Sequence, residues 1–362
     1  MKVGYKEFEN KLKKIRTYMS QKETNGFLIS SQSNMSWLTG GRGFVGINSD
    51  FACGQILVTE KDVYLVTSNI EAPRLTAEEI PAELGLILKE FSWTNYGEMF
   101  SIINSLVPEG KFMRDGDVGR EMWQLRGELT KEECDRYRWL GLNSAKALEQ
   151  ACREAVIGET EFDITGRVSD KLWKLGIEPI TILIAVDGRT TQYRHPIPTE
   201  KKLEKYAIVS ICARKWGLVA SATRLFHFGK PSAELTEKVN KVLSIDTCYI
   251  AKTRPGAVSG DIFARALELY GAYGYKDEWK MHHQGGLTGY GARDYIAGPN
   301  TQHVVGLNQA FAWNPTISGV KAEDTILVLE DGNEIITNTG EYTYVNCECD
   351  GKTYLRPGIL EL

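Results

Sequence analysis

Apolar side chains in the first part of the chain recur at the spacings of helices and strands. An amphipathic helix is predicted where they lie three or four positions apart, at Tyr5, Phe8, Leu12, Ile15 and Met19. Strands are expected at residues 26–31, 55–59 and 63–68, and helices near residues 70–79 and 96–107. This mixture of elements predicts an α/β domain.

A lysine- and glutamate-rich amphipathic run follows, at about residues 129–157. It is too long and too polar for a core strand, so it is expected to form a helix that links two domains. We therefore place the domains at residues 1–128 and 129–362, with the linking helix at the start of the second.

The second part of the chain predicts an α+β unit. Thr160 is a plausible N-cap for a helix at residues 162–175. Two apolar runs between Tyr206 and Gly229 are joined at Lys215-Trp216-Gly217 and predict a hairpin. The remaining expected elements are a strand at 181–186, helices at 234–251 and 261–273, and strands from Ala310 onward, including 326–329.

Bulk composition narrows the class of protein. The 362 residues are 42% hydrophobic and 25% charged, as in ordinary globular proteins. A net charge of -4 gives no electrostatic reason to expect nucleic acid or an anionic membrane as a partner. The N-terminal sequence lacks the apolar stretch of a secretory signal, and no run reaches transmembrane length. A cytoplasmic location is expected.

The seven cysteines are an odd number scattered along the chain, which favours reduced thiols over a disulfide framework. Cys347 and Cys349 are expected to lie on a strand, and Cys212 is expected to be a packed thiol.

The hairpin carries the first chemical motif. Ser210 and Ser221 are eleven residues apart, Gly217 lies seven residues after Ser210, and Thr223-Arg224 follows Ser221. This text resembles the paired strands of the creatinase/aminopeptidase P, or pita-bread, hydrolases, which include Xaa-Pro peptidases and methionine aminopeptidases. In that family both serine positions carry metal-bridging aspartates.

The other ligand positions of the family appear in the same order. In HHQGGLTGY, His283 takes the place of the metal-ligand histidine, while Trp279 and Tyr290 replace two flanking histidines. Asn314 replaces a bridging glutamate, and Glu323 matches the final glutamate. By this resemblance the chain is a divergent, Xaa-Pro peptidase-like member that lacks most of its dinuclear metal ligands.

Two neighbouring divalent cations need several anionic oxygens to offset their charge. No Asp or Glu lies between Lys205 and Lys230, so the missing carboxylates are not supplied nearby. We therefore expect no dinuclear centre and no metal cofactor; a single ion held by His283 and Glu323 is left open.

Three residues are candidates for catalysis. His195 matches the family's substrate-binding histidine, which is the acid/base in creatinase, and imidazole exchanges protons near neutral pH. His283 is expected to donate a proton, with Glu323 orienting it or raising its basicity. His282 is assigned to substrate binding, since adjacent strand residues point to opposite faces.

Arginines and neutral polar groups are the candidates for substrate binding. Guanidinium groups recognise carboxylates, so their number near the motifs suggests a carboxylate-bearing substrate. The set comprises Arg42, Arg189, Arg194, Ser210, Ser221, Arg224, His282, Tyr290 and Asn314. The resemblance implies a homodimer in which Arg42 of one subunit acts at the partner's site.

The resemblance implies an α+β protein with an N-terminal α/β creatinase-like domain and a C-terminal pita-bread domain. We predict a metal-independent hydrolase of creatinase type that cleaves a C–N bond of a small or peptide substrate. The alternatives are an Xaa-Pro aminopeptidase- or dipeptidase-like metallopeptidase, and a catalytically silent homologue that binds a ligand or partner.

Overall fold

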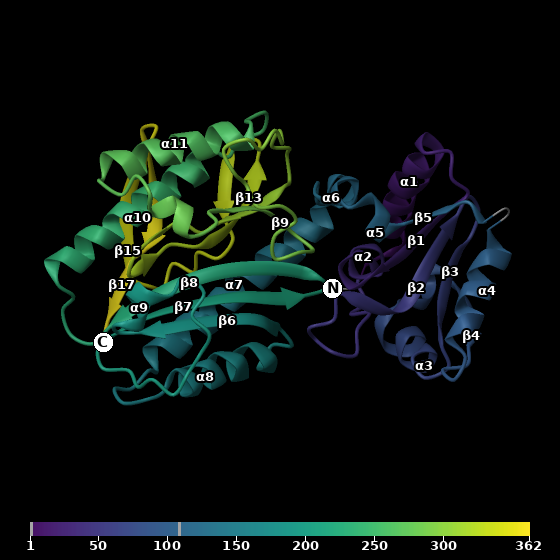
Figure 1. Ribbon diagram of the computed structural model, residues 1–362, viewed down its shortest axis with the longest axis horizontal. Helices are drawn as coiled ribbons and strands as arrows, with labels where there is room; N and C mark the ends of the chain where they lie inside the picture. The colour runs from purple at the N-terminus through teal and green to yellow at the C-terminus, as the bar shows by residue number, and fades with distance from the viewer. Residues whose placement is uncertain (1–2, 108–109) are drawn as a thin grey trace. The chain divides into compact units, whose positions relative to one another are not determined.

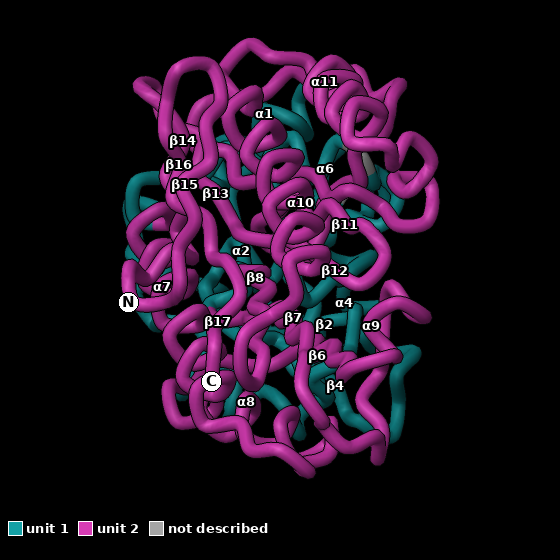
Figure 2. Tube along the Cα trace, turned by 90° about the vertical axis from the view of Figure 1, so that its left-hand side faces the viewer, with its two compact units in different colours: residues 1–132, 216–218 teal, residues 133–215, 219–362 magenta. Residues whose placement is uncertain are grey.

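The computed structural model describes residues 3–107 and 110–362, and the chain forms two compact units (Figures 1 and 2). Unit 1 comprises Met1–Glu132 together with Trp216–Leu218. Unit 2 comprises Glu133–Lys215 and Val219–Leu362. The division falls inside the long helix α7, Lys131–Arg153.

Unit 1 is a five-stranded mixed sheet with helices packed against it. The strand order is β4-β3-β2-β1-β5, with an antiparallel centre and a parallel pair at each edge. The strands are β1 Gly26–Ser31, β2 Phe51–Thr59, β3 Val63–Ser68, β4 Ile87–Phe91 and β5 Phe112–Arg114. The helices are α1 Tyr5–Gln21, α2 Gln32–Thr39, α3 Ala72–Arg74, α4 Tyr96–Leu106, α5 Asp115–Val118 and α6 Arg120–Arg126, with a 3-10 turn at Ala82–Leu84.

The predicted apolar face of α1 is confirmed, because Phe8, Leu12 and Ile15 are fully buried. Under α4 a second apolar cluster joins the helix to the sheet, and Leu28, Val66 and Ile103 are among its members. Burial of these side chains is the main stabilising term that fixes the helices on the sheet.

Two segments of unit 1 differ from the sequence interpretation. No helix is predicted between residues 31 and 55, but the chain forms α2 there. The hydroxyl of Ser31 caps this helix, which ends at Gly40 in the left-handed conformation. The predicted helix at 70–79 is α3 followed by a π-helical turn at Leu75–Glu79, closed by a bond from the Ile80 amide to the Leu75 carbonyl.

Unit 2 contains two four-stranded sheets and two short hairpins. One sheet has the order β17-β8-β7-β6 and the other β14-β13-β10-β9, while β11 pairs with β12 and β15 with β16. The strands are β6 Glu178–Val186, β7 Tyr206–Lys215, β8 Leu218–His227, β9 Gly285–Thr288, β10 Ala310–Trp313, β11 Thr316–Ile317, β12 Val320–Lys321, β13 Asp324–Leu329, β14 Gly332–Ile335, β15 Tyr344–Cys349, β16 Lys352–Pro357 and β17 Ile359–Glu361.

Helices pack against these sheets. In Figure 1, α8 runs along the β6–β7–β8 sheet at the bottom of unit 2, and α10 and α11 lie at its top. The helices are α7, α8 Glu161–Lys174, α9 Arg189–Gln192, α10 Ala233–Lys252 and α11 Ser259–Ala272, with a 3-10 turn, η4, at Glu278–Met281. Among the described residues, no helix is both long and apolar enough to cross a bilayer.

Local signals in unit 2 are confirmed. Thr160 caps α8 in a reciprocal box with Asp163, as the sequence predicts. The β7–β8 hairpin turns at Trp216 and Gly217, whose φ angles of 53° and 80° belong to a two-residue turn that matches strand twist. The predicted hairpin is therefore confirmed, and Ser210 and Thr223 share a hydrogen bond across it.

Candidate functional site

Five of the twelve predicted site residues, His195, Ser210, His283, Asn314 and Glu323, line a pocket of about 280 Å³ in unit 2. It lies where strands β6 and β7 meet the segment from β12 to β13, and β8 is joined to this segment by a bond from the Thr223 amide to the Glu323 carbonyl. The lining residues are Thr181, Leu183, His195, Ser210, Ile211, Cys212, His283, Ala292, Arg293, Asn314, Lys321 and Glu323.

Glu323 is the centre of a buried ion-pair network. One carboxylate oxygen lies 2.8 Å from the guanidinium of Arg293, and the other lies 2.8 Å from Nζ of Lys321. The hydroxyl of Thr223 donates to the same carboxylate at 2.9 Å. Burial alone would raise the pKa of Glu323, but Lys321 and Arg293 lower it to about 2. Glu323 is therefore a fixed anion at neutral pH and a poor base.

The two serines bond to the same cations. Ser210 shares a hydrogen bond of 2.7 Å with Thr223 and accepts from Nζ of Lys321 at 3.3 Å. Ser221 is fully buried, accepts from Arg293 at 3.3 Å and donates to the sulfur of Cys212 at 3.3 Å. Neither serine hydroxyl has a histidine or carboxylate as an adjacent base among the described contacts, so neither is set up as a nucleophile.

These contacts do not fit the dinuclear metal centre that the resemblance implies. Both oxygens of Glu323 face side-chain cations, and both serine positions bond to Lys321 or Arg293. The three charges together give +1, whereas two divalent cations would need several further anions. Side-chain cations thus take the place of metal charge beside Glu323.

Three histidines form a cluster, and two of them, His195 and His283, line the same pocket. The rings of His195 and His282 lie 4.8 Å apart, those of His195 and His283 5.5 Å, and those of His282 and His283 are stacked at 4.5 Å. Nε2 of His195 is 3.0 Å from Nε2 of His282.

The cluster is electrically neutral at pH 7. Burial, with Lys321 as the second cause, lowers the pKa of His195 and takes the pKa of His282 to about 2. Burial and then Arg293 lower the pKa of His283 to about 4. Glu323 does raise the pKa of His283, as expected, but burial, Arg293 and His195 lower that pKa by more.

The expectation that His282 and His283 point to opposite faces of a strand is wrong. His282 follows the 3-10 turn η4, and β9 begins only at Gly285, so the pair precedes the strand. Both rings therefore reach His195.

Of the nine predicted substrate-binding residues, only Ser210 and Asn314 line the pocket. Arg224 is fully buried, and its guanidinium forms ion pairs with the carboxylates of Glu149 at 2.8 Å and Asp324 at 3.0 Å. These ion pairs link elements in the interior of unit 2. Tyr290 is buried and donates to Glu133 at 2.6 Å. Asn314 lines the pocket, and its carboxamide oxygen has no protein partner in the described structure.

The remaining arginines pair with acids at other places. Arg189 pairs with the buried Glu161 beside α8, and Arg194 pairs with Glu278. Arg42 belongs to unit 1, where it binds Glu79 at 2.7 Å. Its action in a partner subunit stays a prediction, as do the substrate-binding roles.

The sequence interpretation missed Lys321 and Arg293. Lys321 ends the two-residue strand β12, two positions before Glu323, and Arg293 lies in a loop after β9. A single sequence does not show whether a lysine or arginine is buried. The available sign that these two residues belong to the site was their position beside segments already assigned to it.

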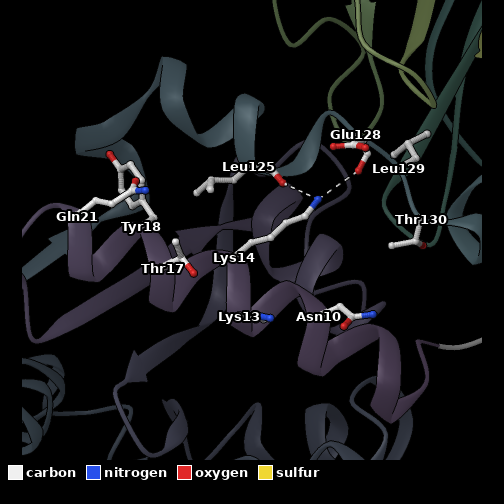
Figure 3. A pocket seen from close by; sticks show the side chains of 10 residues that line it. All are labelled: Asn10, Lys13, Lys14, Thr17, Tyr18, Gln21, Leu125, Glu128, Leu129 and Thr130. Carbon is white, nitrogen blue, oxygen red and sulfur yellow. Dashed lines mark hydrogen bonds between the residues drawn. The ribbon is translucent and has the colours of Figure 1, made fainter.

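A larger pocket, of about 620 Å³, lies in unit 1 along α1 (Figure 3). Nζ of Lys14 reaches across it to the carbonyls of Leu125 and Glu128 at 3.5 Å. No histidine, cysteine or predicted site residue is among its described lining residues, so the chemistry points to unit 2.

The sequence matches two family models. Residues 11–133 match the creatinase/prolidase N-terminal domain. Residues 137–330, more than half of the chain, match metallopeptidase family M24.

Individual relatives agree with these matches. An Xaa-Pro dipeptidase of Pyrococcus horikoshii is 23% identical over 356 residues, which cover 91% of this chain and 97% of the relative. An uncharacterized peptidase of Staphylococcus haemolyticus is 26% identical, and the match covers 62% of this chain and 66% of that protein, just under two thirds. The crystal structure of the prolidase from Pyrococcus horikoshii shares the fold with a TM-score of 0.76, at 20% identity, over 91% of this chain and 98% of that one.

These findings correct the functional prediction. The metal-independent hydrolase of creatinase type is wrong, because the matched family is one of metallopeptidases and the named relatives are an Xaa-Pro dipeptidase and a prolidase. The alternative of an Xaa-Pro dipeptidase-like metallopeptidase is the better supported one. With a creatinase N-terminal domain followed by a pita-bread domain, the chain belongs to metallopeptidase family M24, the creatinase/aminopeptidase P family.

Proposed function

We propose that this protein is a peptidase of the Xaa-Pro dipeptidase class that takes a short peptide into the pocket of unit 2. The observation that carries the proposal is the match to an Xaa-Pro dipeptidase along 91% of the chain, with the polar pocket at the family's site. No catalytic step is assigned to a dinuclear centre, since the residues do not fit one.

The charges of the pocket support recognition of a peptide carboxylate. Lys321 and Arg293 outnumber Glu323, so the pocket keeps a net positive charge beside polar groups such as Asn314. An anionic end of a short peptide is attracted to such a site, and the guanidinium can bind it in a bidentate manner.

His195 is proposed as the group that acts on the attacking water. It lines the pocket and is the most exposed ring of the cluster, so a substrate can reach it. A free imidazole at this place would take a proton from the water, and an imidazole that binds a metal ion would instead hold the ion that activates the water.

The test is hydrolysis of a panel of Xaa-Pro dipeptides, with non-prolyl dipeptides as controls, in chelator and with added zinc, cobalt or manganese. Release of proline that requires a metal ion is expected. His195→Ala should lower kcat/KM by roughly 10²–10⁴-fold, and His227→Ala, outside the cluster, should leave it unchanged. Release that persists undiminished in chelator would contradict a metallopeptidase.

A second candidate is peptide binding without hydrolysis. It is favoured by the ion pairs of Lys321 and Arg293 with Glu323, which occupy a carboxylate that the family uses as a metal ligand. Saturable binding of the same dipeptides in calorimetry, with no product under any metal condition, would select this function.

A homodimer and a cytoplasmic location complete the proposal as predictions. The resemblance supports the dimer, and light scattering and cell fractionation test the two points.

A further inference from the structure

Two separate segments of unit 2 bring three histidines together. His195 lies in the loop after α9, and His282 and His283 lie between η4 and β9, almost ninety residues later. One ring nitrogen from each histidine lies within 4.8 Å of the others. No other group of three or more metal-ligating side chains gathers in this way among residues 3–107 and 110–362.

We propose that His195, His282 and His283 bind a single transition-metal ion, with zinc or cobalt as the expected occupant. Three protein ligands with one position left open is the arrangement of catalytic zinc sites. The proposal rests on the proposed function for its consequence, which is that this ion supplies the metal dependence of hydrolysis.

The distances are close to those of a metal site. Nitrogens that bind one ion at about 2.0–2.1 Å lie roughly 3.3 Å apart in tetrahedral geometry, and never more than about 4.2 Å apart. The Nε2 atoms of His195 and His282 are already 3.0 Å apart. The widest pair, at up to 4.8 Å, must therefore close by about 1.5 Å to reach tetrahedral spacing, a movement of the rings that binding of the ion has to drive.

The hydrogen bonding of the rings leaves room for an ion. His282 is 6% exposed, and Nδ1 of His282 and Nδ1 of His283 have no partner in the described structure. A buried polar atom without a partner is unfavourable, and an ion bound by these rings would give such a nitrogen a partner.

The nature of the ligands selects the kind of ion. Imidazole nitrogens suit zinc, cobalt, nickel and copper, whereas magnesium, calcium and manganese prefer carboxylate and carbonyl oxygens. The surviving acid, Glu323, is bound to Lys321 and Arg293 and offers little to a hard cation. This site is therefore distinct in ligand type from the family's carboxylate-rich centre.

The neighbouring charges set the expected strength. Lys321 and Arg293 repel a divalent ion, and Glu323 offsets one of them. We expect binding weaker than that of an isolated three-histidine site. Replacing Lys321 by methionine should tighten zinc binding about tenfold, because one repelling charge is removed and tenfold corresponds to about 1.4 kcal/mol of Coulomb energy.

The experiment strips the full-length protein with a chelator and titrates it with zinc in a calorimeter and with cobalt in a spectrophotometer. One equivalent per chain is expected, with the visible cobalt bands of four-coordinate geometry. His195→Ala and His282→Ala should abolish this binding, while His227→Ala and Ser210→Ala should retain it. Circular dichroism establishes that each variant is folded.

The outcomes separate this site from the proposed function. One equivalent of cobalt without hydrolysis of any peptide would support the metal site and contradict the peptidase. Failure of zinc to bind at stoichiometric amounts, or binding that His195→Ala leaves unchanged, would overturn the site. If the histidine variants do not fold, tighter zinc binding by Lys321→Met supports the site, and unchanged or weaker binding opposes it.

Discussion

Buried charged side chains of unit 2 have two different roles: some form ion pairs in the interior, and others face the pocket. Arg224 and Arg356 both pair with Asp324 in the interior and make no part of the pocket lining. Lys321 and Arg293 are nearly as buried but face the pocket. The first pair holds strands and helices together, and the second gives the pocket its charge.

Arg224→Met should therefore destabilise the protein. Removing one partner of a buried ion pair leaves Glu149 without its cation and Asp324 with Arg356 alone, which costs about 3–5 kcal/mol. Urea unfolding measures the loss. Arg265→Met, on a residue whose side chain is 62% exposed, should change stability by less than about 1 kcal/mol. A loss of similar size in both variants would contradict the structural role of Arg224.

Glu323→Gln should reduce the acid sensitivity of the protein. The pKa of Glu323 is lowered from 4.5 to about 2 in the folded protein, so its contribution is complete above pH 4.5 and is lost as the pH falls towards 2. Between pH 6 and pH 3.5 the loss is roughly 1.4 kcal/mol.

Urea midpoints at the two pH values test this. The difference between them should shrink in Glu323→Gln and stay the same in Glu234→Gln, whose side chain is 86% exposed. An unchanged difference in Glu323→Gln would show that the carboxyl is not held as an anion.

The sequence located the motif positions well, because spacing along a hairpin carries over directly to space. Ser210, Asn314 and Glu323 line one pocket as their family positions imply. The ion pairs could not be predicted, since Arg293 and Glu323 are thirty residues apart on different segments. Arg224 shows the converse, a motif residue whose side chain turns into the core.

At the scale of elements, the capping and turn signals were the most informative. The long amphipathic run became α7, and Thr160 became the cap of α8. The short strands β4 and β5 were not predicted, and β11, β12 and β14 were covered only by the expectation of strands from Ala310 onward, because two to five residues carry too little periodicity. An error at this scale affected His282, because the residue was assigned to a strand that in fact starts three residues later.

Thr160→Ala should destabilise α8. The hydroxyl accepts from the amide of Asp163 and donates to its carboxylate, and loss of such a cap costs about 1 kcal/mol. Thr160→Ser keeps the hydroxyl and should remain within a few tenths of the parent. Chemical unfolding of the two variants side by side measures the effect, and equal losses would indicate that the methyl group matters more than the cap.

At the scale of the whole molecule, the chain has the two-domain architecture of its relatives while its site chemistry differs. The fold matches a prolidase over 98% of that structure at 20% identity, which core packing tolerates because apolar substitutions of similar volume are accepted. Replacement of ligand residues changes the charge of the site without disturbing this core. The chemistry of the site can therefore change while the architecture persists.

The full-length protein should form a homodimer, as the family resemblance implies. Light scattering coupled to size exclusion should give twice 40.6 kDa. The mass should hold across a tenfold dilution if the dimer is stable. A single 40.6 kDa species at all concentrations would rule out a role for Arg42 in a partner subunit.

The ion pairs around Glu323 have a consequence for how the protein responds to its surroundings. Lysine and arginine are tethered to the chain, so their positive charge cannot be lost when transition metals become scarce in the cell. With the peptide binding and the histidine metal site proposed above, attraction of an anionic ligand persists during metal starvation, and only the histidine site empties. Capture of the ligand and readiness to cleave it are then separate steps, and metal supply governs the second alone.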